Sequence, residues 1–233
     1  MPIPTEKKIK KQPADYYYQG YYHSWSLRSL FYRKKFKYIL KKLKENRVQN
    51  LLDLGCGNGI LLKLAQEEGI HTLGVDNDIN FLKIAEKILG KGEVVYGDIL
   101  KLTLKKKFNA ITCLDVLEHF QNQDLPAVFS NISAHLKNQG ILIITFPSKF
   151  YIKIIEPVWK IIRFLIYGRR NFIDEDIHNL IKLQNIKKIA QNNNLQLKDQ
   201  RLITGGLLNY LIFQNRRTFA FGNKIRISLQ KKF

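Results

Sequence analysis

The stretch Leu51-Leu52-Asp53-Leu54-Gly55-Cys56-Gly57-Asn58-Gly59 decides the fold of this chain. Its apolar first half predicts a short buried strand. Its three glycines at alternate positions predict a tight turn, because residues without a Cβ let the backbone bend and lie against a ligand. Residues 60–68 follow with helical spacing. The turn therefore presents a helix N-terminus, with its unpaired N–H groups, to whatever lies in the loop.

The spacing of the glycines separates two classes of cofactor. The dinucleotide fingerprint G-x-G-x-x-G needs its third glycine at position 60, which is Ile60 here. This chain reads G-x-G-x-G instead, and Asp53 stands two residues before the first glycine. A carboxylate at that place suits an ammonium group better than a pyrophosphate. The stretch resembles motif I, hhDhGCGxG, of the class I S-adenosylmethionine (SAM) methyltransferases, and the resemblance implies SAM as the cofactor.

Length and composition favour one domain in a reducing compartment. A chain of 233 residues, 45% of them hydrophobic, can bury a sizeable core. Its two cysteines, Cys56 and Cys113, form no disulfide framework. Residues 1–8 lack an apolar run and no run of ~18 apolar residues occurs, so we expect neither a signal peptide nor a transmembrane helix. The expected location is the cytoplasm, extending to the inner face of the membrane if the basic segments bind lipid.

The net charge of +20 is unevenly distributed. Residues 1–47 contain 13 Lys and Arg against 3 acids, residues 48–148 contain 9 against 11, and residues 149–233 contain 17 against 5. Attraction to an anionic membrane, a nucleic acid or an acidic substrate would explain the basic flanks. Lysine-rich solvated faces are the alternative, and composition does not separate the two.

From residue 50 onward, short apolar runs alternate with helical segments. This alternation predicts a parallel sheet with helices on both faces, which binds ligands at the carboxyl ends of its strands. We expect an α/β, Rossmann-like, doubly wound sheet of seven mostly parallel strands, closed by an antiparallel hairpin. The expected strands are Asn50–Leu54, Thr72–Val75, Glu93–Tyr96, Asn109–Leu114, Gly140–Phe146, Leu195–Thr204 and Leu208–Gln214, and the expected helices are Ser26–Lys44, Gly59–Glu68, Ile79–Leu89, Leu125–Leu136 and Ile181–Asn193.

The chain is expected to divide into three parts. Residues 1–47 form a basic extension with an aromatic cluster and one helix, residues 48–215 form the methyltransferase domain, and residues 216–233 form a basic tail. Residues 150–172 break the rhythm with an apolar helical pattern that carries one narrow polar stripe. We expect an interfacial helix there that also covers the acceptor pocket. A lid helix packed wholly on protein is the alternative.

The resemblance implies a role for Asp53 and for the acids that follow the second and third strands. Asp53 and the glycine turn would hold the methionine end of SAM. Asp76, 21 residues after Gly55, would accept both ribose hydroxyls, with a helix cap as its alternative role. Asp98 would accept the adenine amino group. The predicted cofactor-binding residues are Asp53, Gly55, Cys56, Gly57, Asn58, Gly59, Asp76, Asn77, Asp98, Ile99, Leu114 and Asp115.

The end of the fourth strand carries a closer resemblance. Residues 112–120 resemble the matching segment of the ubiquinone (coenzyme Q) O-methyltransferases, in which the positions of Asp115, Glu118 and His119 are associated with a divalent cation. The same Glu-His pair also occurs in family members without metal, and we predict no metal site. Methyl transfer to an alcohol or phenol needs alignment of the acceptor and removal of a proton. His119 and His178 are the candidate general bases.

Together, these features predict a SAM-dependent methyltransferase that acts on a small, lipophilic acceptor, with O-methylation favoured. An RNA or protein methyltransferase that uses the basic surface is the first alternative. Against it, the fourth strand ends in Leu114-Asp115 rather than in the Asn-Pro-Pro-aromatic motif of amino-adenine enzymes. A non-catalytic SAM-binding or membrane-associated partner protein is the second alternative. The oligomeric state is not predicted.

Overall fold

A computed structural model describes residues 27–155, 157–158, 161, 181–203 and 208–216. The predictions for the aromatic cluster, for His178, for the turn around Gly205-Gly206, for most of residues 156–172 and for the basic tail from residue 217 fall outside the described residues.

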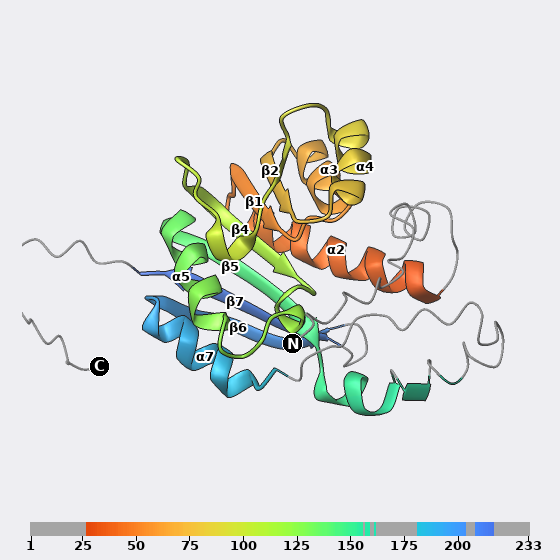
Figure 1. Cartoon of the computed structure of the whole chain (residues 1–233), viewed down its shortest axis with the longest axis vertical. Coiled ribbons are helices and arrows are strands. Elements are labelled where there is room, and N and C mark those ends of the chain that lie inside the picture. Colours follow the sequence, from red (N-terminus) through yellow and green to blue (C-terminus); the bar gives the residue numbers. More distant parts are fainter. Residues whose placement is uncertain (1–26, 156, 159–160, 162–180, 204–207, 217–233) are drawn as a thin grey trace, which may run out of the picture.

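The described chain forms one seven-stranded sheet in the order β3-β2-β1-β4-β5-β7-β6 (Figure 1). The first five strands in the chain run parallel, and β7 runs antiparallel to both β5 and β6. This architecture confirms the predicted fold class. The strands are β1 (Asn50–Leu54), β2 (His71–Asp76), β3 (Val94–Tyr96), β4 (Phe108–Leu114), β5 (Leu136–Pro147), β6 (Leu195–Ile203) and β7 (Leu208–Asn215).

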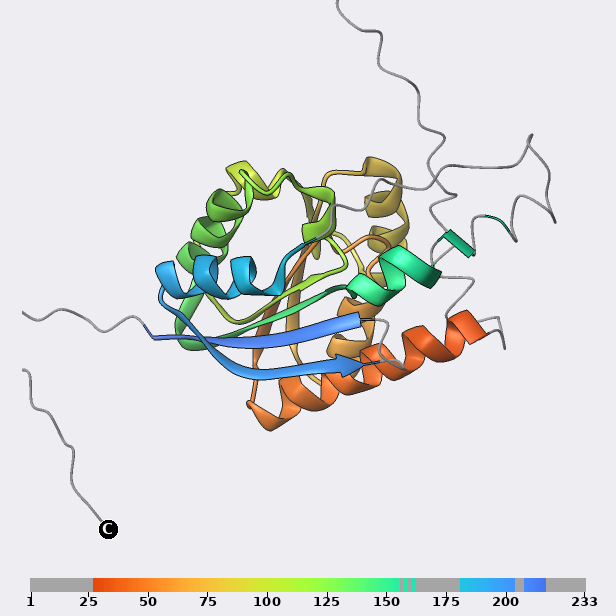
Figure 2. The same cartoon turned by 90° about the horizontal axis from the view of Figure 1, so that it is seen from below.

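The helices lie on both faces of the sheet, as the alternation predicts. Figure 2 shows α2 on one side of β6 and β7, with α5 and α7 on the other side. Within β1, Leu51 packs in the core on the α2 face, whereas Leu52 packs in the core on the α5 face. This is the two-residue period of a strand buried on both sides. The helices are α2 (Leu27–Glu45), α3 (Ile60–Glu67), α4 (Ile79–Leu89), α5 (Leu125–His135) and α7 (Leu183–Asn192), with short helical turns η1 (Ile99–Lys101), η2 (Leu117–His119) and η3 (Tyr151–Ile155).

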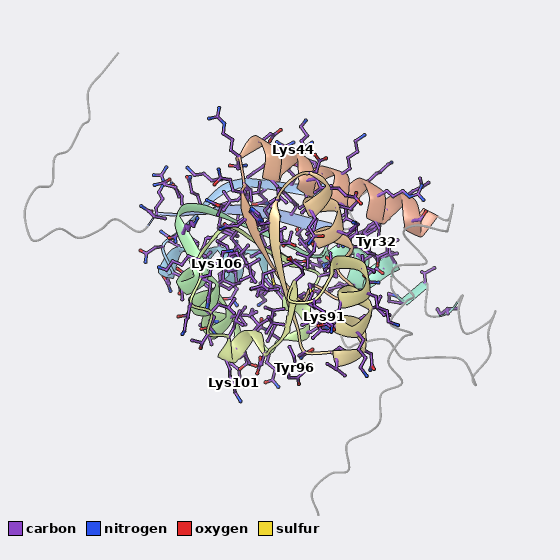
Figure 3. The ribbon with its side chains drawn as sticks, turned by 90° about the horizontal axis from the view of Figure 1, so that it is seen from above. Tyr32, Lys44, Lys91, Tyr96, Lys101 and Lys106 are labelled. Carbon is purple, nitrogen blue, oxygen red and sulfur yellow. The ribbon has the colours of Figure 1, made fainter. Side chains whose placement is uncertain are left out.

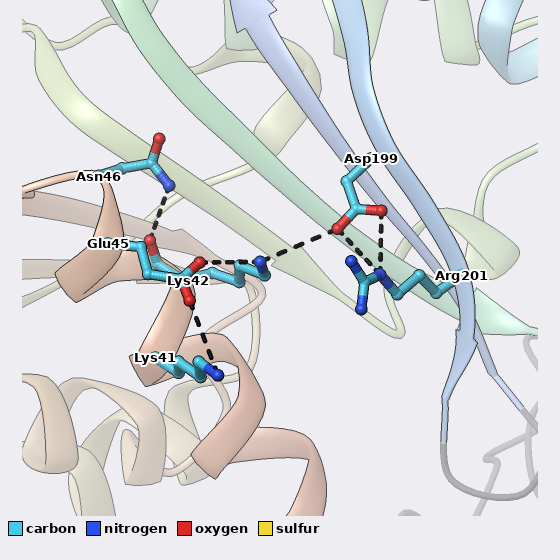
Figure 4. A network of polar contacts seen from close by, with 6 residues as sticks. All are labelled: Lys41, Lys42, Glu45, Asn46, Asp199 and Arg201. Carbon is cyan, nitrogen blue, oxygen red and sulfur yellow. Dashed lines mark hydrogen bonds and ion pairs between the residues drawn. The ribbon is translucent and has the colours of Figure 1, made fainter.

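Helix α2 is tied to the far edge of the sheet. The ring of Tyr38 meets that of Tyr210 of β7 edge to face, with 4.8 Å between centroids. Lys42 forms ion pairs with Glu45 at 2.8 Å and with Asp199 of β6 at 4.0 Å (Figure 4). Helix α2 is therefore packed on the sheet, where it covers β7 and β6.

The surface is basic over several separate elements. The lysines labelled in Figure 3 come from α2 (Lys44), the loop after α4 (Lys91), η1 (Lys101) and the loop before β4 (Lys106), and all four are exposed. Within the described residues, no helix has both the length and the hydropathy needed to cross a membrane.

Candidate cofactor and active site

The glycine turn joins β1 to α3 in a left-handed backbone. Gly55, Gly57 and Gly59 have φ values of 73°, 53° and 78°, a region that residues with a side chain rarely adopt. A Cβ on Gly55 would collide with Val116 Cγ2, and a Cβ on Gly59 would lie 2.7 Å from Leu89 Cδ1. A Cβ on Gly57 would have nothing within 4 Å. The first and third glycines therefore permit close packing, while the second borders the open space where a ligand can approach the backbone.

Asp76, at the end of β2, holds the turn in shape. Its Oδ2 accepts a hydrogen bond from Gly57 N at 2.8 Å, and its Oδ1 accepts one from Asp78 N at 2.9 Å. Burial raises the pKa of Asp76, although these two backbone hydrogen bonds act to lower it. The cap of α4 is Asp78, which accepts a hydrogen bond from Asn80 N, and Asn77 is exposed beside it. Each oxygen of Asp76 retains a second lone pair, which suits the two hydroxyls of a ribose.

Asp53 is a buried carboxylic acid under the turn. It lies on the same face of β1 as Leu51, two residues away, and its Oδ1 accepts a hydrogen bond from Thr112 Oγ1 at 2.6 Å. Burial raises the pKa of Asp53 to about 7, against the opposing effects of Thr112 and Lys35. A ligand ammonium group near Asp53 would offset the cost of burying the carboxylate.

The remaining residues predicted around the turn and after β3 are divided between surface and core. Asp98 is exposed and caps η1 by accepting a hydrogen bond from Leu100 N at 2.9 Å. Ile99 is only 7% exposed and packs in the core, so its contact with an adenine ring stays a prediction. Cys56 and Asn58 are buried within the turn. Burial raises the pKa of the Cys56 thiol far above its ordinary range, which indicates a packing role rather than a reactive one.

The chain turns sharply where β4 ends. Leu114 is partly buried, and Asp115 follows it in a left-handed conformation with φ of 55°. The Asp115 carboxylate accepts a hydrogen bond from Thr145 Oγ1 at 2.7 Å and forms an ion pair with Lys35 Nζ at 2.7 Å. We did not predict this role of Lys35, although the sequence carries a signal for it. Position 35 lies four and eight residues before Ile39 and Leu43, on the buried stripe of α2.

The turn η2 places Glu118 in the interior and His119 at the surface, although the two are neighbours in the sequence. Glu118 is 1% exposed, and its Oε2 has no hydrogen-bond partner among the described residues. Burial and the nearby Asp115 raise the pKa of Glu118 well above its ordinary value. His119, the next residue, is exposed. Across the described part of the chain, no three His, Cys, Asp or Glu side chains are grouped in a way that could hold a metal ion.

The predicted acids lie at the carboxyl ends of neighbouring strands, which we call the cofactor edge of the sheet. Asp53, Asp76, Asp98 and Asp115 come from β1, β2, the loop after β3 and the end of β4, which are neighbours in the parallel part of the sheet. The glycine turn follows β1 at this edge, and a Cβ on Gly57 would meet open space. The arrangement suits a cofactor with an amino acid end, a ribose and a base laid across four strands.

The sequence profile of one protein family, described as a methyltransferase domain, matches residues 24–200. The chain belongs to this methyltransferase family. Among its curated relatives is the ubiquinone biosynthesis O-methyltransferase of Glaesserella parasuis, 29% identical over 137 residues that cover 53% of this chain and 57% of the relative. The mitochondrial enzyme of the same name in Schizosaccharomyces pombe is 28% identical over 151 residues, covering 59% of this chain and 54% of the relative. The chain thus spans little more than half the length of these two relatives.

Solved structures of other methyltransferases share the fold. Magnesium protoporphyrin IX methyltransferase from Synechocystis PCC 6803 with bound S-adenosylhomocysteine (SAH) has a TM-score of 0.65 at 20% identity, covering 87% of this methyltransferase and 94% of that chain. A SAM-bound amino pentose methyltransferase from Micromonospora echinaspora has a TM-score of 0.65 at 15% identity, covering 90% and 99% of the two chains. The recognition of the family and its cofactor from residues 51–59 is confirmed.

Proposed function

We propose that this methyltransferase transfers a methyl group from SAM to an oxygen atom of a small, lipophilic acceptor. The observation that carries the proposal is the set of four acids at the cofactor edge of neighbouring strands, beside the open space at Gly57. The printed names of the curated relatives, which are O-methyltransferases of ubiquinone biosynthesis, support the choice of oxygen and of a lipophilic acceptor.

In this proposal, different residues bind different parts of SAM. Asp53 and the glycine turn bind the methionine end, Asp76 with Asn77 binds the ribose, and Asp98 with Ile99 binds the adenine. Leu114 and Asp115 close the site on the side of β4. When bound, SAM supplies a methyl group on a positively charged sulfonium. The chain must then hold the acceptor hydroxyl in line with that methyl group and remove its proton.

A histidine is the side chain best suited to take the proton near neutral pH. His119 is exposed at the end of η2, which follows β4 directly at the cofactor edge. We assign His119 the role of general base, with His178 as the second candidate. No divalent metal takes part in the proposal, because Lys35 already neutralises Asp115.

A lipophilic acceptor would reach the site from an anionic membrane surface. The segment after β5 leaves the sheet at the cofactor edge (Figure 1). Four of its described apolar side chains are between 49% and 59% exposed. Their spacing of three or four residues in the sequence is that of one face of a helix. Lys149 and Lys153 accompany them and would meet lipid headgroups. The apolar residues are Phe150, Ile154, Val158 and Ile161.

Labelled methyl transfer tests the proposed activity. The full chain is incubated with methyl-labelled SAM and, in parallel, with a lipid extract, total RNA and a protein extract. We expect label in the lipid fraction only. Asp76→Ala is the matched control and should weaken SAM binding by more than about tenfold, since hydrogen bonds to charged groups contribute ~1.5–3 kcal/mol. Label in RNA or protein alone, or in no fraction at all, would contradict the proposal.

A further inference from the structure

Helix α2 is anchored to the rest of the domain by side-chain interactions at two places along its length. The first anchor is the network of Lys42, Glu45, Asp199 and Arg201 near its C-terminal end, shown in Figure 4. It lies beside a hollow of about 440 Å³ that is lined by Ile141 of β5 and by residues of β7. This hollow is near the amino-terminal ends of the parallel strands, away from the glycine turn. The second anchor is Lys35, which reaches the cofactor edge.

Lys35 is buried, and its ammonium group is surrounded by a carboxylate and two aromatic rings. The side chain is 4% exposed, and Nζ lies 2.7 Å from Asp115 Oδ2. The rings of Tyr32 and Phe36 approach Nζ to 4.9 Å and 5.2 Å from their centroids. Burial alone would lower the pKa of Lys35, but Asp115 raises it overall, so the ammonium group stays charged. A buried ion pair of this kind is costly to break, because it leaves one charge without its partner.

Asp115, the partner of Lys35, adopts a left-handed backbone conformation at the end of β4. Asp115 holds a φ of 55°, and three interactions fix it there: its N–H donates to Thr145 O at 2.9 Å, Thr145 Oγ1 donates to its carboxylate, and Lys35 forms the ion pair. The bend sends Val116 against the glycine turn, where its Cγ2 occupies the space that a Cβ on Gly55 would need. A continuous set of contacts therefore leads from α2 to the turn.

We propose that Lys35 is a positioning residue for the cofactor: through Asp115 and Val116, its ion pair holds Gly55 and the glycine turn in the shape that binds SAM. The proposal rests on the proposed function, since it concerns the same site. It assigns α2 a task in binding beyond covering the sheet. Without the ammonium group, Asp115 keeps only Thr145, the left-handed bend relaxes, and Val116 withdraws from Gly55.

The test compares two lysines of the same helix. Lys35→Met removes the anchor at the cofactor edge, and Lys42→Met removes the anchor at the other end. Binding of SAH to each full chain is measured by titration calorimetry, after circular dichroism has shown that each variant folds. Lys35→Met should weaken binding by about tenfold or more, the loss expected for one charged hydrogen bond. Lys42→Met should bind like the wild type, and Lys35→Arg, which keeps the cation, should restore most of the affinity.

A double-mutant cycle separates positioning from general stability. Val116→Ala removes the methyl groups that touch Gly55. If Lys35 acts through Val116, the double variant should bind SAH no more weakly than Lys35→Met alone. Losses of affinity that simply add would contradict the proposal. Should Lys35→Met fail to fold, Thr145→Val takes its place, because it removes the other side-chain bond to Asp115 at almost constant volume.

Hydrogen–deuterium exchange of the cofactor-free chain tests the same coupling without the cofactor. The amides of residues 55–59 should exchange faster in Lys35→Met than in the wild type or in Lys42→Met. Unchanged exchange at these amides together with unchanged SAH affinity would overturn the proposal. A wild-type chain that binds no SAH would overturn the proposed function instead, and the exchange measurement would still decide whether Lys35 shapes the turn.

Discussion

The protonation of the Asp53 carboxyl group depends on folding and on the binding of the cofactor. Burial raises its pKa from an ordinary value of 3.8 to about 7 in the cofactor-free fold. The folded chain therefore binds more protons than the unfolded chain between these two values, and the contribution of Asp53 to stability falls as the pH rises through this window. Above it, the contribution is constant. A bound ammonium group reverses the preference, because it favours the carboxylate.

The affinity for SAH should therefore depend on pH through Asp53. Since binding releases the proton of Asp53 below its pKa of about 7, affinity should rise as the pH is raised toward 7 and approach a tenfold gain per unit. Calorimetry in buffers of different ionisation enthalpy would count the released proton. Asp53→Asn carries no such proton and should bind weakly without the pH dependence. An equal pH dependence in Asp53→Asn would place the titrating group elsewhere.

The glycines of the turn should differ in what they tolerate. Gly57→Ala adds a methyl group where nothing lies within 4 Å, at a φ of 53°. We expect a stability loss of ~1 kcal/mol from backbone strain. SAH affinity should fall at least about tenfold, or ~1.4 kcal/mol, because the methyl group occupies cofactor space. Gly59→Ala is the contrasting variant, since its Cβ would lie 2.7 Å from Leu89 Cδ1 and should mainly lower the melting temperature. The reverse pattern in melting and calorimetry would show that Gly57 does not face the cofactor.

Among the elements, the strands and long helices were predictable and the turns that finish the site were not. Helix α4 begins and ends where its periodicity predicts, at Ile79 and Leu89. Strand β5 begins four residues earlier than expected, because Leu136 pairs with Phe108 before an irregularity that includes Gln139 at φ of 61°. The turns η1 and η2 are three residues long, too short for any hydrophobic period to appear.

The polar interior of the site was hidden from sequence reasoning for a different reason. Thr112 and Thr145 look like ordinary β-branched strand residues, and only the register of β1, β4 and β5 brings them to Asp53 and Asp115. Asp76, Asp98 and Asp115 could be predicted at this end of the sheet, because each one follows an apolar run where a strand ends. Asp53 could be predicted from its place two residues before the first glycine of the turn. The side-chain partners of Asp53 and Asp115 could not, because they lie 30 to 80 residues away in the chain.

The side chains around η2 predict that methyl transfer does not need a divalent cation. Asp115 is already paired with Lys35, and burial favours the protonated form of Glu118, which is a poor metal ligand. We therefore expect methyl transfer to be unchanged in EDTA. Activity that disappears in EDTA and returns with Mg²⁺ would instead support a cation held by Asp115, Glu118 and His119.

At the scale of the whole molecule, the exposed apolar residues after β5 make a prediction about membranes. The full chain should co-sediment with phosphatidylglycerol vesicles at low salt, since apolar burial and basic residues act together at an interface. The double variant Phe150→Asp, Ile154→Asp should stay in solution. Tyr96→Asp is the control, because Tyr96 is 65% exposed on β3, which β2, β1 and β4 separate from β5. Failure of the wild type to co-sediment would leave the segment after β5 as a pocket wall or a protein contact.

The strand order also has a consequence for how the protein is made. Strand β7 is the last of the described strands, yet it lies between β5 and β6 and provides Tyr210, against which α2 packs. A ribosome that has released only residues 1–200 therefore presents a sheet with an open edge at β5, and helix α2 without the strand against which it packs. Open edges of this kind attract other chains. The nascent protein thus stays in need of protection until its final strand emerges, although every acid of the cofactor edge has been synthesised long before.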